Sequence, residues 1–448
     1  MSDDNSSIHK KRIKASDLAR RSSDNFRKTY GHSPLDSVAP FQRDEIILGR
    51  RVGAGSFSFV YDIQDFNLCP KPSKKYTNEQ VKKREAIAKS AKNGAKYVMK
   101  CLKGKLEVSD DEEIFHCAAQ DIAFEAEVLA ALSHPNIVKL HGVVDSHCDA
   151  FREGASEYFI ILERLDCTLD EKIEGWSKPS RSLKSLRSSF SSRGSVDKGP
   201  LDEGRSLHSR LGVAASLASA IDCLHSQGVI FRDLKPDNVG FDRHGNLKLF
   251  DFGMARFMPG HGDAYDDVHE MTGLGTPRYA APEVIFYHPY NLKSDIYSFS
   301  VVLWEILSLK KPFAQYKQRK DLERAFSRID SKTLAINRKW PQPIQDFIEC
   351  GSSRDLWARP VMSEVCKVLN ECISKGAVHC DSTSTRILAV DSRRSKSLIL
   401  PSPIRLQNTR SFGQSSFQKK NVRQLSKATT VTVDTSVEEV FSGEGLAG

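Results

Sequence analysis

Four residues of this chain have the side-chain types and the spacing that phosphoryl transfer requires. They are Asp233, Lys235, Asn238 and Asp251. Phosphoryl transfer needs an acceptor for a hydroxyl proton, a cation beside the γ-phosphate and oxygen ligands for Mg²⁺. A carboxylate, a lysine, an amide and a second carboxylate supply this set. The sequence therefore predicts a transfer reaction that uses ATP and Mg²⁺.

The residues around these four resemble the catalytic and Mg-binding loops of the eukaryotic protein kinases. The chain has the run Phe231-Arg232-Asp233-Leu234-Lys235-Pro236-Asp237-Asn238, followed by Asp251-Phe252-Gly253. The resemblance implies that Asp233 accepts or orients the proton of the substrate hydroxyl. It implies that Lys235 stabilises the transferred phosphoryl group. Asn238 and Asp251 would bind Mg²⁺, or Mn²⁺ in its place.

Phe231 departs from the family, in which this position is usually His. By resemblance, this residue is not an acid or base in the reaction, because its ring packs behind the Mg-binding loop. Its expected neighbours are Leu129, Leu140 and Phe252. Phenylalanine keeps the apolar ring, so we expect catalysis to survive the change.

A glycine-rich segment between two expected strands resembles the kinase loop that covers the phosphates of ATP. It reads Gly53-Ala54-Gly55-Ser56-Phe57-Ser58-Phe59-Val60, with Ser58 in place of the third glycine. Glycines at the first two positions let backbone N–H groups approach phosphates closely. The residues that the resemblance assigns to ATP are Val52, Gly53, Gly55, Ser58, Val60, Lys100, Leu162, Glu163 and Leu165.

Lys100 resembles the kinase lysine that neutralises the α- and β-phosphates, and such a lysine needs a carboxylate from the following helix. Glu125 lies ten residues before Pro135, where the family has this carboxylate. Glu127 is the competing choice. The two glutamates would face about 200° apart around a helix, so only one of them can point at Lys100.

Two features predict transfer to Ser or Thr. Lys235 lies two residues after Asp233, as in Ser/Thr kinases, and the run 275–283 (GTPRYAAPE) resembles their substrate-docking segment. By resemblance, the Thr276 hydroxyl bridges Asp233 and Lys235. The dipeptide Trp304-Glu305 resembles the tyrosine-kinase-like branch of the family.

The resemblance also implies structural pairs and a regulatory site. Glu283 would pair with Arg359, and Asp295 would hold the backbone of the catalytic loop. Arg232 precedes the catalytic Asp, as in kinases that are activated by phosphorylation. Thr272 lies three residues before Gly275, so we expect phosphorylation of Thr272 to raise activity through pairing with Arg232.

The elements that must position these residues predict an α+β, bilobal protein kinase fold. Its N-lobe would be a small five-stranded sheet with one main helix, and its C-lobe would be larger and mainly helical. The expected strands are 46–52, 57–61, 96–102, 137–144 and 158–163. The main expected helices are 79–92, 115–132, 207–226, 294–309, 320–327, 342–349 and 361–373.

The predicted domain limits follow from composition. Residues 1–45 read as a disordered basic tail and 374–448 as a disordered C-terminal tail. The kinase domain would span 46–373, with an N-lobe at 46–163 and a C-lobe at 164–373. An insertion at about 66–95 would interrupt the N-lobe, and a disordered Ser-rich insertion at about 177–204 the C-lobe.

Charge and cysteine content bound the function classes. The 448 residues carry a formal charge of +9, largely in the polar tails, so we expect no specific nucleic-acid partner. The ten cysteines form no C-x-x-C pair, and no apolar run is long enough for a leader or a membrane span. We expect a cytoplasmic or nuclear protein. The basic run 10–14 (KKRIK) reads as a tail or as a nuclear address.

The predicted partners are ATP, protein substrates with Ser or Thr, and regulators that bind the tails. Two alternatives to an active kinase stay open at this point. One is a pseudokinase scaffold, which loss of catalytic residues would favour. The other is an interaction protein whose tails carry the function.

Overall fold

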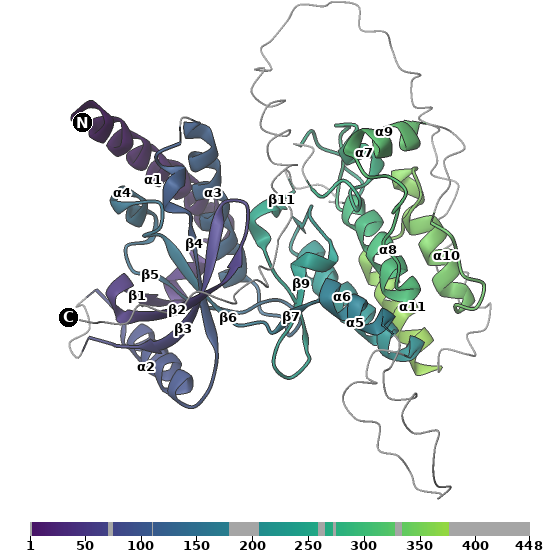
Figure 1. Ribbon diagram of the computed structural model, residues 1–448, viewed down its shortest axis with the longest axis horizontal. Coiled ribbons are helices and arrows are strands. Elements are labelled where there is room, and N and C mark those ends of the chain that lie inside the picture. Colours follow the sequence, from purple (N-terminus) through teal and green to yellow (C-terminus); the bar gives the residue numbers. More distant parts are fainter. Residues whose placement is uncertain are drawn as a thin grey trace, which may run out of the picture.

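The computed structural model describes residues 2–69, 75–109, 111–178, 206–258, 265–271, 275–327 and 334–375. Figure 1 shows two lobes, a strand-rich N-lobe and a helical C-lobe. The predicted α+β bilobal fold is confirmed. The predicted Ser-rich insertion and C-terminal tail lie almost entirely outside the described residues.

The described part of the N-lobe contains a six-stranded sheet in the order β1-β5-β6-β4-β3-β2. Five of these strands match the predicted ones. β4 is buried along its whole length, as its run of apolar residues suggests. The strands are β1 (Ala39–Phe41), β2 (Ile46–Ala54), β3 (Ser58–Phe66), β4 (Tyr97–Leu102), β5 (Leu140–Val144) and β6 (Phe159–Glu163).

The sixth strand, β1, corrects the prediction of five strands and of a disordered segment up to residue 45. β1 pairs in parallel with β5, and Ala39 lies opposite Gly142. The ring of Phe41 is buried and packs against Gly142. A Cβ at Gly142 would lie only 2.7 Å from the ring, so the glycine makes room for it. A three-residue strand shows no alternation that sequence reasoning can detect.

Helix α1 (Ser2–Tyr30) is the larger correction, since residues 1–45 were predicted to be disordered. It packs against α3 (Glu112–Ala131) and α4 (Ala150–Glu153), and Figure 1 shows it beside them. Its buried positions are the small residues Ala15, Ser16 and Ala19, together with Phe26. A stripe of small residues lets two helices approach closely, but it gives almost no apolar signal in the sequence.

The predicted helix of the first insertion is confirmed as α2 (Asn78–Lys92). Thr77 and Gln80 form a capping box at its start, since each side chain accepts a hydrogen bond from the other's backbone N–H. The N-lobe therefore has three long helices among its described residues, α1, α2 and α3, and not one main helix.

The C-lobe is built on α8 (Lys293–Ser308), whose side chains are buried along nearly the whole helix. The predicted C-lobe helices are present, with ends that shift by one or two residues. They are α6 (Leu207–Ser226), α9 (Arg319–Ser327), α10 (Gln342–Gly351) and α11 (Met362–Ser374), joined by α5 (Leu169–Ser177) and the short α7 (Pro282–Ile285).

Two small sheets lie where the lobes meet. One has the order β10-β9-β7 and the other pairs β11 with β8. Their strands are β7 (Cys167–Thr168), β8 (Val229–Ile230), β9 (Val239–Phe241), β10 (Leu247–Leu249) and β11 (Arg256–Phe257). Asp233, Lys235 and Asn238 lie between β8 and β9, and Asp251 lies between β10 and β11.

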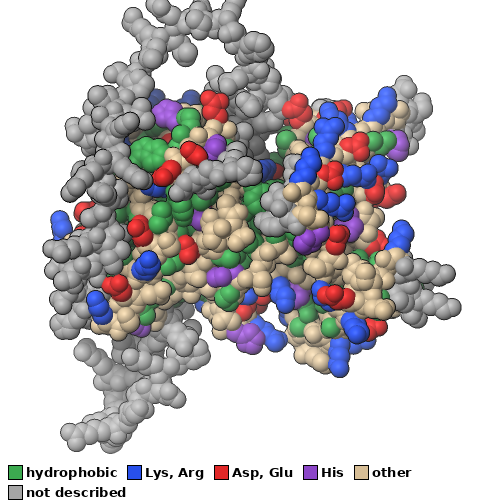
Figure 2. Space-filling model, turned by 180° about the vertical axis from the view of Figure 1, so that it is seen from behind, with side chains coloured by type: hydrophobic (Ala, Val, Ile, Leu, Met, Phe, Trp, Pro, Cys, Tyr) green, Lys and Arg blue, Asp and Glu red, His purple; other side chains and the backbone are tan. Residues whose placement is uncertain are grey.

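Two further predictions concerned the distribution of charge on the surface and the lack of a membrane-spanning helix. On the face shown in Figure 2, acidic and basic side chains are interspersed over the described surface. No helix within the described residues combines the length and the apolar character needed to cross a membrane.

Candidate active site

The catalytic loop joins β8 to β9 and brings three predicted residues into direct contact. Lys235 Nζ donates to Asp233 Oδ2 at 2.8 Å and to Thr276 Oγ1 at 3.1 Å. The Thr276 hydroxyl donates to Asp233 Oδ1 at 2.9 Å, as does the Thr276 backbone N–H. The predicted bridge by Thr276 is therefore present, and it fixes the carboxylate at both oxygens.

The amide of Asn238 completes this group. Its Nδ2 donates to the carbonyl oxygen of Asp233 at 2.8 Å and to Oδ2 at 3.0 Å. Asn238 belongs to a 3-10 turn, Pro236–Asn238, which follows directly on Lys235. The short turn explains why residues two and five positions after Asp233 both reach back to it.

Asp295 at the start of α8 holds the catalytic loop from below, as predicted. Its Oδ2 accepts from the backbone N–H of Phe231 at 2.8 Å, and its Oδ1 accepts from that of Arg232 at 2.9 Å. Arg232 has a φ of +72°, which is strained for a residue with a side chain. The two hydrogen bonds to a buried carboxylate offset that strain.

Lys100 contacts two carboxylates of the predicted site, those of Glu125 and Asp251. Its Nζ lies 2.6 Å from Glu125 Oε2 and 2.8 Å from Asp251 Oδ1. Burial alone would lower the pKa of Lys100, but Asp251 and Glu125 together raise it. Lys100 in turn lowers the pKa of Asp251. The site therefore holds an ammonium and an ionised Asp251 where phosphates would bind.

The structure decides between the two glutamates of α3. Glu125 pairs with Lys100 and also accepts a weak hydrogen bond from the backbone N–H of Phe252 at 3.4 Å. Glu127 is fully buried on another side of α3, where both its oxygens accept from Ser33 Oγ at 3.1 Å. The choice of Glu125 is confirmed.

Phe231 packs where the sequence places it. Its ring is 1% exposed and meets the buried ring of Phe252 edge to face, with 5.2 Å between centroids. Leu129 and Leu140, its other expected neighbours, are buried as well. The phenylalanine side chain itself has no group that donates or accepts a conventional hydrogen bond.

The match to a known family agrees with this geometry. A model described as the protein kinase domain matches residues 85–375, which is more than half of the chain. The chain belongs to the protein kinase family.

Relatives of this kinase carry kinase names. A leaf rust 10 disease-resistance locus receptor-like protein kinase-like 1.3 from Arabidopsis thaliana is 29% identical over 255 residues, which are 56% of this chain and 31% of the relative. The cAMP-dependent protein kinase type 3 of Saccharomyces cerevisiae is 36% identical over 146 residues, 33% of this chain and 34% of the relative.

A dual specificity protein kinase, shkC, from Dictyostelium discoideum is 30% identical over 174 residues, which are 38% of this chain and 34% of the relative. The kinase chain matches about a third of the length of each of these three relatives.

The family match begins inside α2, after the glycine-rich hairpin, yet β2 and β3 belong to the same sheet as the matched strands.

The glycine-rich segment of the kinase closes as a hairpin between β2 and β3. Gly53 pairs with Val60, and the backbone N–H of Gly55 donates to the Ser58 carbonyl oxygen at 3.0 Å. A Cβ at Gly55 would lie 3.0 Å from the Ser58 hydroxyl. A side chain at position 55 would therefore crowd the serine that replaces the third glycine, and Gly55 leaves room for it.

The other residues assigned to ATP lie on β2, on β6 and just after β6. Val52 lies on β2, before its end at Ala54, and Leu162 is buried on β6. The Glu163 carboxylate binds elsewhere, since it accepts from Lys248 Nζ at 2.9 Å and from the Lys139 N–H at 2.8 Å. Leu165 packs over Gly240 of β9, where a Cβ would lie 2.6 Å from its side chain.

The predicted regulatory pair is only partly described. The Arg232 guanidinium is buried, its Nε donates to the Met254 carbonyl oxygen at 2.6 Å, and burial lowers its pKa. Thr272 lies outside the described residues. The pairing of Arg232 with a phosphate on Thr272 stays a prediction.

An ion pair between α3 and the segment after Gly253 was not predicted from the sequence. Arg256 Nη2 donates to the Asp121 carboxylate and the guanidinium lies over the Phe124 ring, 5.2 Å from its centroid. Asp121 lies one turn before Glu125 on the same helix, and that spacing was the available signal. Gly275 was also missed as a constraint: its φ is +119°, and a Cβ there would lie 2.8 Å from the Arg232 carbonyl oxygen.

Proposed function

We propose that this protein kinase is an active serine/threonine kinase that transfers the γ-phosphate of ATP to hydroxyls of protein substrates. The observation that carries the proposal is the Thr276 hydroxyl, which contacts both Asp233 Oδ1 and Lys235 Nζ. This arrangement lines up an acceptor for the substrate proton and a cation for the transferred group on one side of the cleft.

Asp233 is the group that would orient the substrate hydroxyl and accept its proton. The carboxylate is nearly buried and is fixed by Thr276, Lys235 and Asn238, so it needs no reorganisation when substrate binds. Lys235 would compensate the charge of the phosphoryl group in transfer. General-base groups of this kind contribute about 10²–10⁴ in rate.

Asn238 and Asp251 fit a divalent cation. The Nδ2 of Asn238 donates to Asp233, so the side-chain oxygen of Asn238 points away from Asp233. The Asp251 side chain is half exposed, and Lys100 keeps it ionised by lowering its pKa. Among the described residues no group of three or more His, Cys, Asp and Glu forms a complete metal site. Two protein oxygens suit Mg²⁺, or Mn²⁺, which takes its other ligands from water and phosphates. When bound, the cation supplies neutralisation of phosphate charge.

The pocket for ATP would be formed by the hairpin at Gly53 and Gly55 above, and by Leu162 and Leu165 at the back. Lys100 would contact the α- and β-phosphates. The ion pair with Glu125 supports this, because it fixes the Lys100 ammonium at the inner end of the cleft. Since its carboxylate is engaged by Lys248, Glu163 would contribute only its backbone.

Regulation through Thr272 belongs to the same proposal. A phosphate there would carry about −1.5 to −2 charges and would pair with Arg232 beside the catalytic loop. We expect Thr272→Ala to lower kcat/KM relative to a wild-type kinase that is shown to be phosphorylated. Equal values would remove the proposed switch. A cytoplasmic or nuclear location and regulators bound to the tails stay predictions.

The test is radiolabelled ATP transfer by the full chain to peptides that carry Ser, Thr or Tyr, with Asp233→Ala as control. We expect label on Ser and Thr peptides. Comparable label on Tyr would contradict the proposed specificity while keeping kinase activity. No label above the Asp233→Ala control would favour the pseudokinase scaffold.

A further inference from the structure

The N-terminal segment, residues 11–37, lies on the side of α3 that faces away from the sheet. Helix α3 contacts β4 and β5 on one side, and α1 and the 3-10 turn Pro34–Ser37 on the other. Figure 1 shows α1 running beside α3 at the edge of the N-lobe. The helix that carries Glu125 is therefore held between the sheet and the N-terminal segment.

Phe26 connects this segment to two parts of the active site at once. Its ring is 1% exposed and lies 5.3 Å from the Phe124 ring of α3 and 4.9 Å from the Phe257 ring of β11. Phe124 and Phe257 also meet edge to face at 5.9 Å. Phe124 directly precedes Glu125, and Phe257 lies in the strand that follows the metal-binding turn.

Glu127 provides a second, polar attachment. Its buried carboxylate accepts from Ser33 Oγ at 3.1 Å, and the Ser23 hydroxyl is a further hydrogen-bond partner. Burial of a carboxylate costs free energy unless hydrogen bonds compensate it. Both compensating hydroxyls come from the N-terminal segment, so α3 and this segment depend on each other.

The start of α3 and the loop before it are tied to α1 by charged groups. Arg12 forms a bidentate pair with Glu107, with both nitrogen-to-oxygen distances at 2.9 Å. Lys11 Nζ donates to the Ser109 carbonyl oxygen at 3.2 Å, and the His116 ring contacts the Lys11 carbonyl oxygen at 3.2 Å. Contacts thus run from the first turn of α3 to beyond Glu125.

We propose that the N-terminal segment positions the catalytic ion pair: by holding α3 through Phe26 and Glu127, it keeps Glu125 within reach of Lys100. The inference rests on the proposed kinase function. Phe26 and Glu127 are positioning residues, since neither touches the predicted phosphate site. An α3 without this support would lose the contact of Phe124 with the Phe26 ring and the hydroxyl partners of Glu127, and Lys100 would spend less time paired with Glu125.

A negative charge added to Ser23 would release the N-terminal segment from α3. Ser23 is half-buried beside Glu127, and it ends the run Arg20-Arg21-Ser22-Ser23, which resembles a site for basophilic kinases. A negative group on Ser23 would face the buried carboxylate of Glu127 at close range. Like-charge repulsion and desolvation would then oppose docking.

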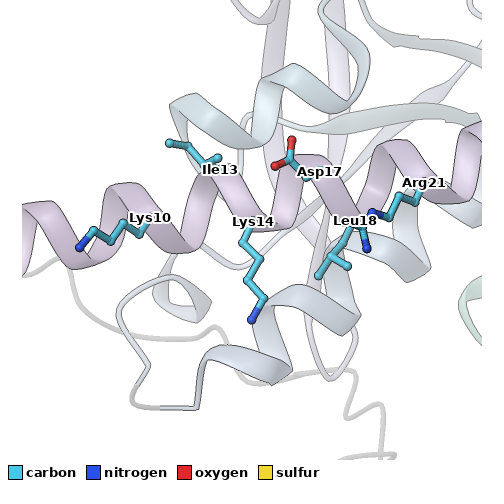
Figure 3. A pocket seen from close by; sticks show the side chains of 6 residues that line it. All are labelled: Lys10, Ile13, Lys14, Asp17, Leu18 and Arg21. Atoms are coloured by element: carbon cyan, nitrogen blue, oxygen red, sulfur yellow. The ribbon is translucent and has the colours of Figure 1, made fainter.

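The exposed side of the same helix offers a matched control. Lys10, Ile13, Lys14, Asp17, Leu18 and Arg21 line a shallow hollow along α1, and Figure 3 shows their side chains. Ile13 is 36% exposed, whereas Ala15, Ser16 and Ala19 are fully buried on the other side. Ile13→Ala removes apolar atoms from α1 without touching the contact with α3.

The test compares the full chain with Phe26→Ala, Phe26→Leu and Ile13→Ala, by steady-state kinetics and by amide hydrogen exchange of residues 112–131. We expect Phe26→Ala to lower kcat/KM at least tenfold, mainly through kcat, and to speed exchange in α3. Phe26→Leu should recover most of both, and Ile13→Ala should stay within twofold of wild type. Wild-type kcat/KM in Phe26→Ala, or equal losses in Phe26→Ala and Ile13→Ala, would overturn the proposal.

Ser23→Asp provides a second variant if Phe26→Ala does not fold. It should reduce kcat/KM and α3 protection, whereas Ser23→Ala should change kcat/KM less than threefold; equal behaviour of the two would overturn the proposal. If the wild-type chain transfers no phosphate above Asp233→Ala, the proposed function fails. The exchange data still decide the positioning, because faster α3 exchange in Phe26→Ala than in Ile13→Ala supports it and equal exchange contradicts it.

Discussion

Glu125 and Glu127 lie two positions apart on α3, and their carboxylates serve opposite sides of that helix. Glu125 pairs with Lys100 in the cleft, at 2.6 Å, and Glu127 accepts from Ser33 of the N-terminal segment, at 3.1 Å. Both carboxylates are buried. The catalytic ion pair and the attachment of the N-terminal segment are therefore parts of one helix.

Substitution of each glutamate in turn should separate these two functions. Glu125→Gln removes the charge that fixes Lys100, and we expect kcat/KM to fall at least tenfold with little change in melting temperature. Glu127→Ala leaves buried hydroxyls without their acceptor, and we expect about 1–3 kcal/mol of destabilisation. Urea denaturation and steady-state kinetics on both variants measure this. Unchanged stability of Glu127→Ala would contradict the packing described for α3.

The side chain of Thr276 should act through its hydroxyl. Thr276→Ser keeps the group that contacts Asp233 and Lys235, and Thr276→Ala removes it. We expect Thr276→Ser to stay within a few-fold of wild type and Thr276→Ala to lose about tenfold or more in kcat, because Asp233 then loses a fixed donor. Similar rates for the two variants would show that the hydroxyl does not orient Asp233.

Phe231 should matter for stability and not for the reaction. Phe231→Ala would leave a cavity beside Phe252 and cost about 3–5 kcal/mol. Phe231→His, which restores the residue usual in the family, keeps a ring, and we expect its kcat/KM to lie within about threefold of wild type. Thermal denaturation and kinetics of both variants test this. A large gain in kcat for Phe231→His would mean that the phenylalanine limits catalysis.

Arg359 and Glu283 give a prediction with a defined dependence on pH. Burial alone would raise the pKa of the Glu283 carboxyl, but Arg359, at 2.6 and 2.8 Å, holds it below its ordinary value. A carboxylate whose folded-state pKa is depressed stabilises the protein above its unfolded pKa and loses this effect as pH falls. Arg359→Ala leaves the charge buried and unpaired, at a cost of about 3–5 kcal/mol near pH 7.

The loss of folding stability in Arg359→Ala should become smaller as pH falls through the range in which Glu283 takes up a proton. In the variant, burial without a partner raises the pKa of Glu283, so protonation relieves the unpaired charge earlier than in wild type. Denaturant unfolding at pH 7 and pH 5 measures the difference. A deficit that is the same at both values would show that the ion pair is not its source.

The fold was predictable where long segments carry a clear period. Helices such as α6 and α8 have enough apolar residues to mark their buried sides, and their predicted ends differ from the observed ones by at most one residue. The catalytic-loop residues were predictable because Asp233, Lys235 and Asn238 lie in the short loop between β8 and β9, where spacing alone brings them together.

The N-terminal segment could not be predicted from its own sequence. The buried side of its helix α1 includes Ala15, Ser16, Ala19 and Phe26, and its charged residues read as a solvated tail. The segment is stabilised by partners far along the chain, such as Phe257 and Glu127. Tertiary packing of this kind leaves no local pattern, and for the same reason the sequence could not assign a partner to Glu127.

The central claim, that Asp233 serves phosphoryl transfer, is tested most directly by single-site kinetics on the full chain. The measurement is kcat/KM for ATP with a phosphorylated Ser peptide as product, in wild type and in Asp233→Asn, which keeps the size of the side chain but removes its charge and replaces one of its two acceptor oxygens by a donor. We predict that the wild type transfers phosphate to the Ser peptide and that kcat/KM of the variant is lower by a factor of about 10²–10⁴. Equal rates in the two proteins would contradict the account.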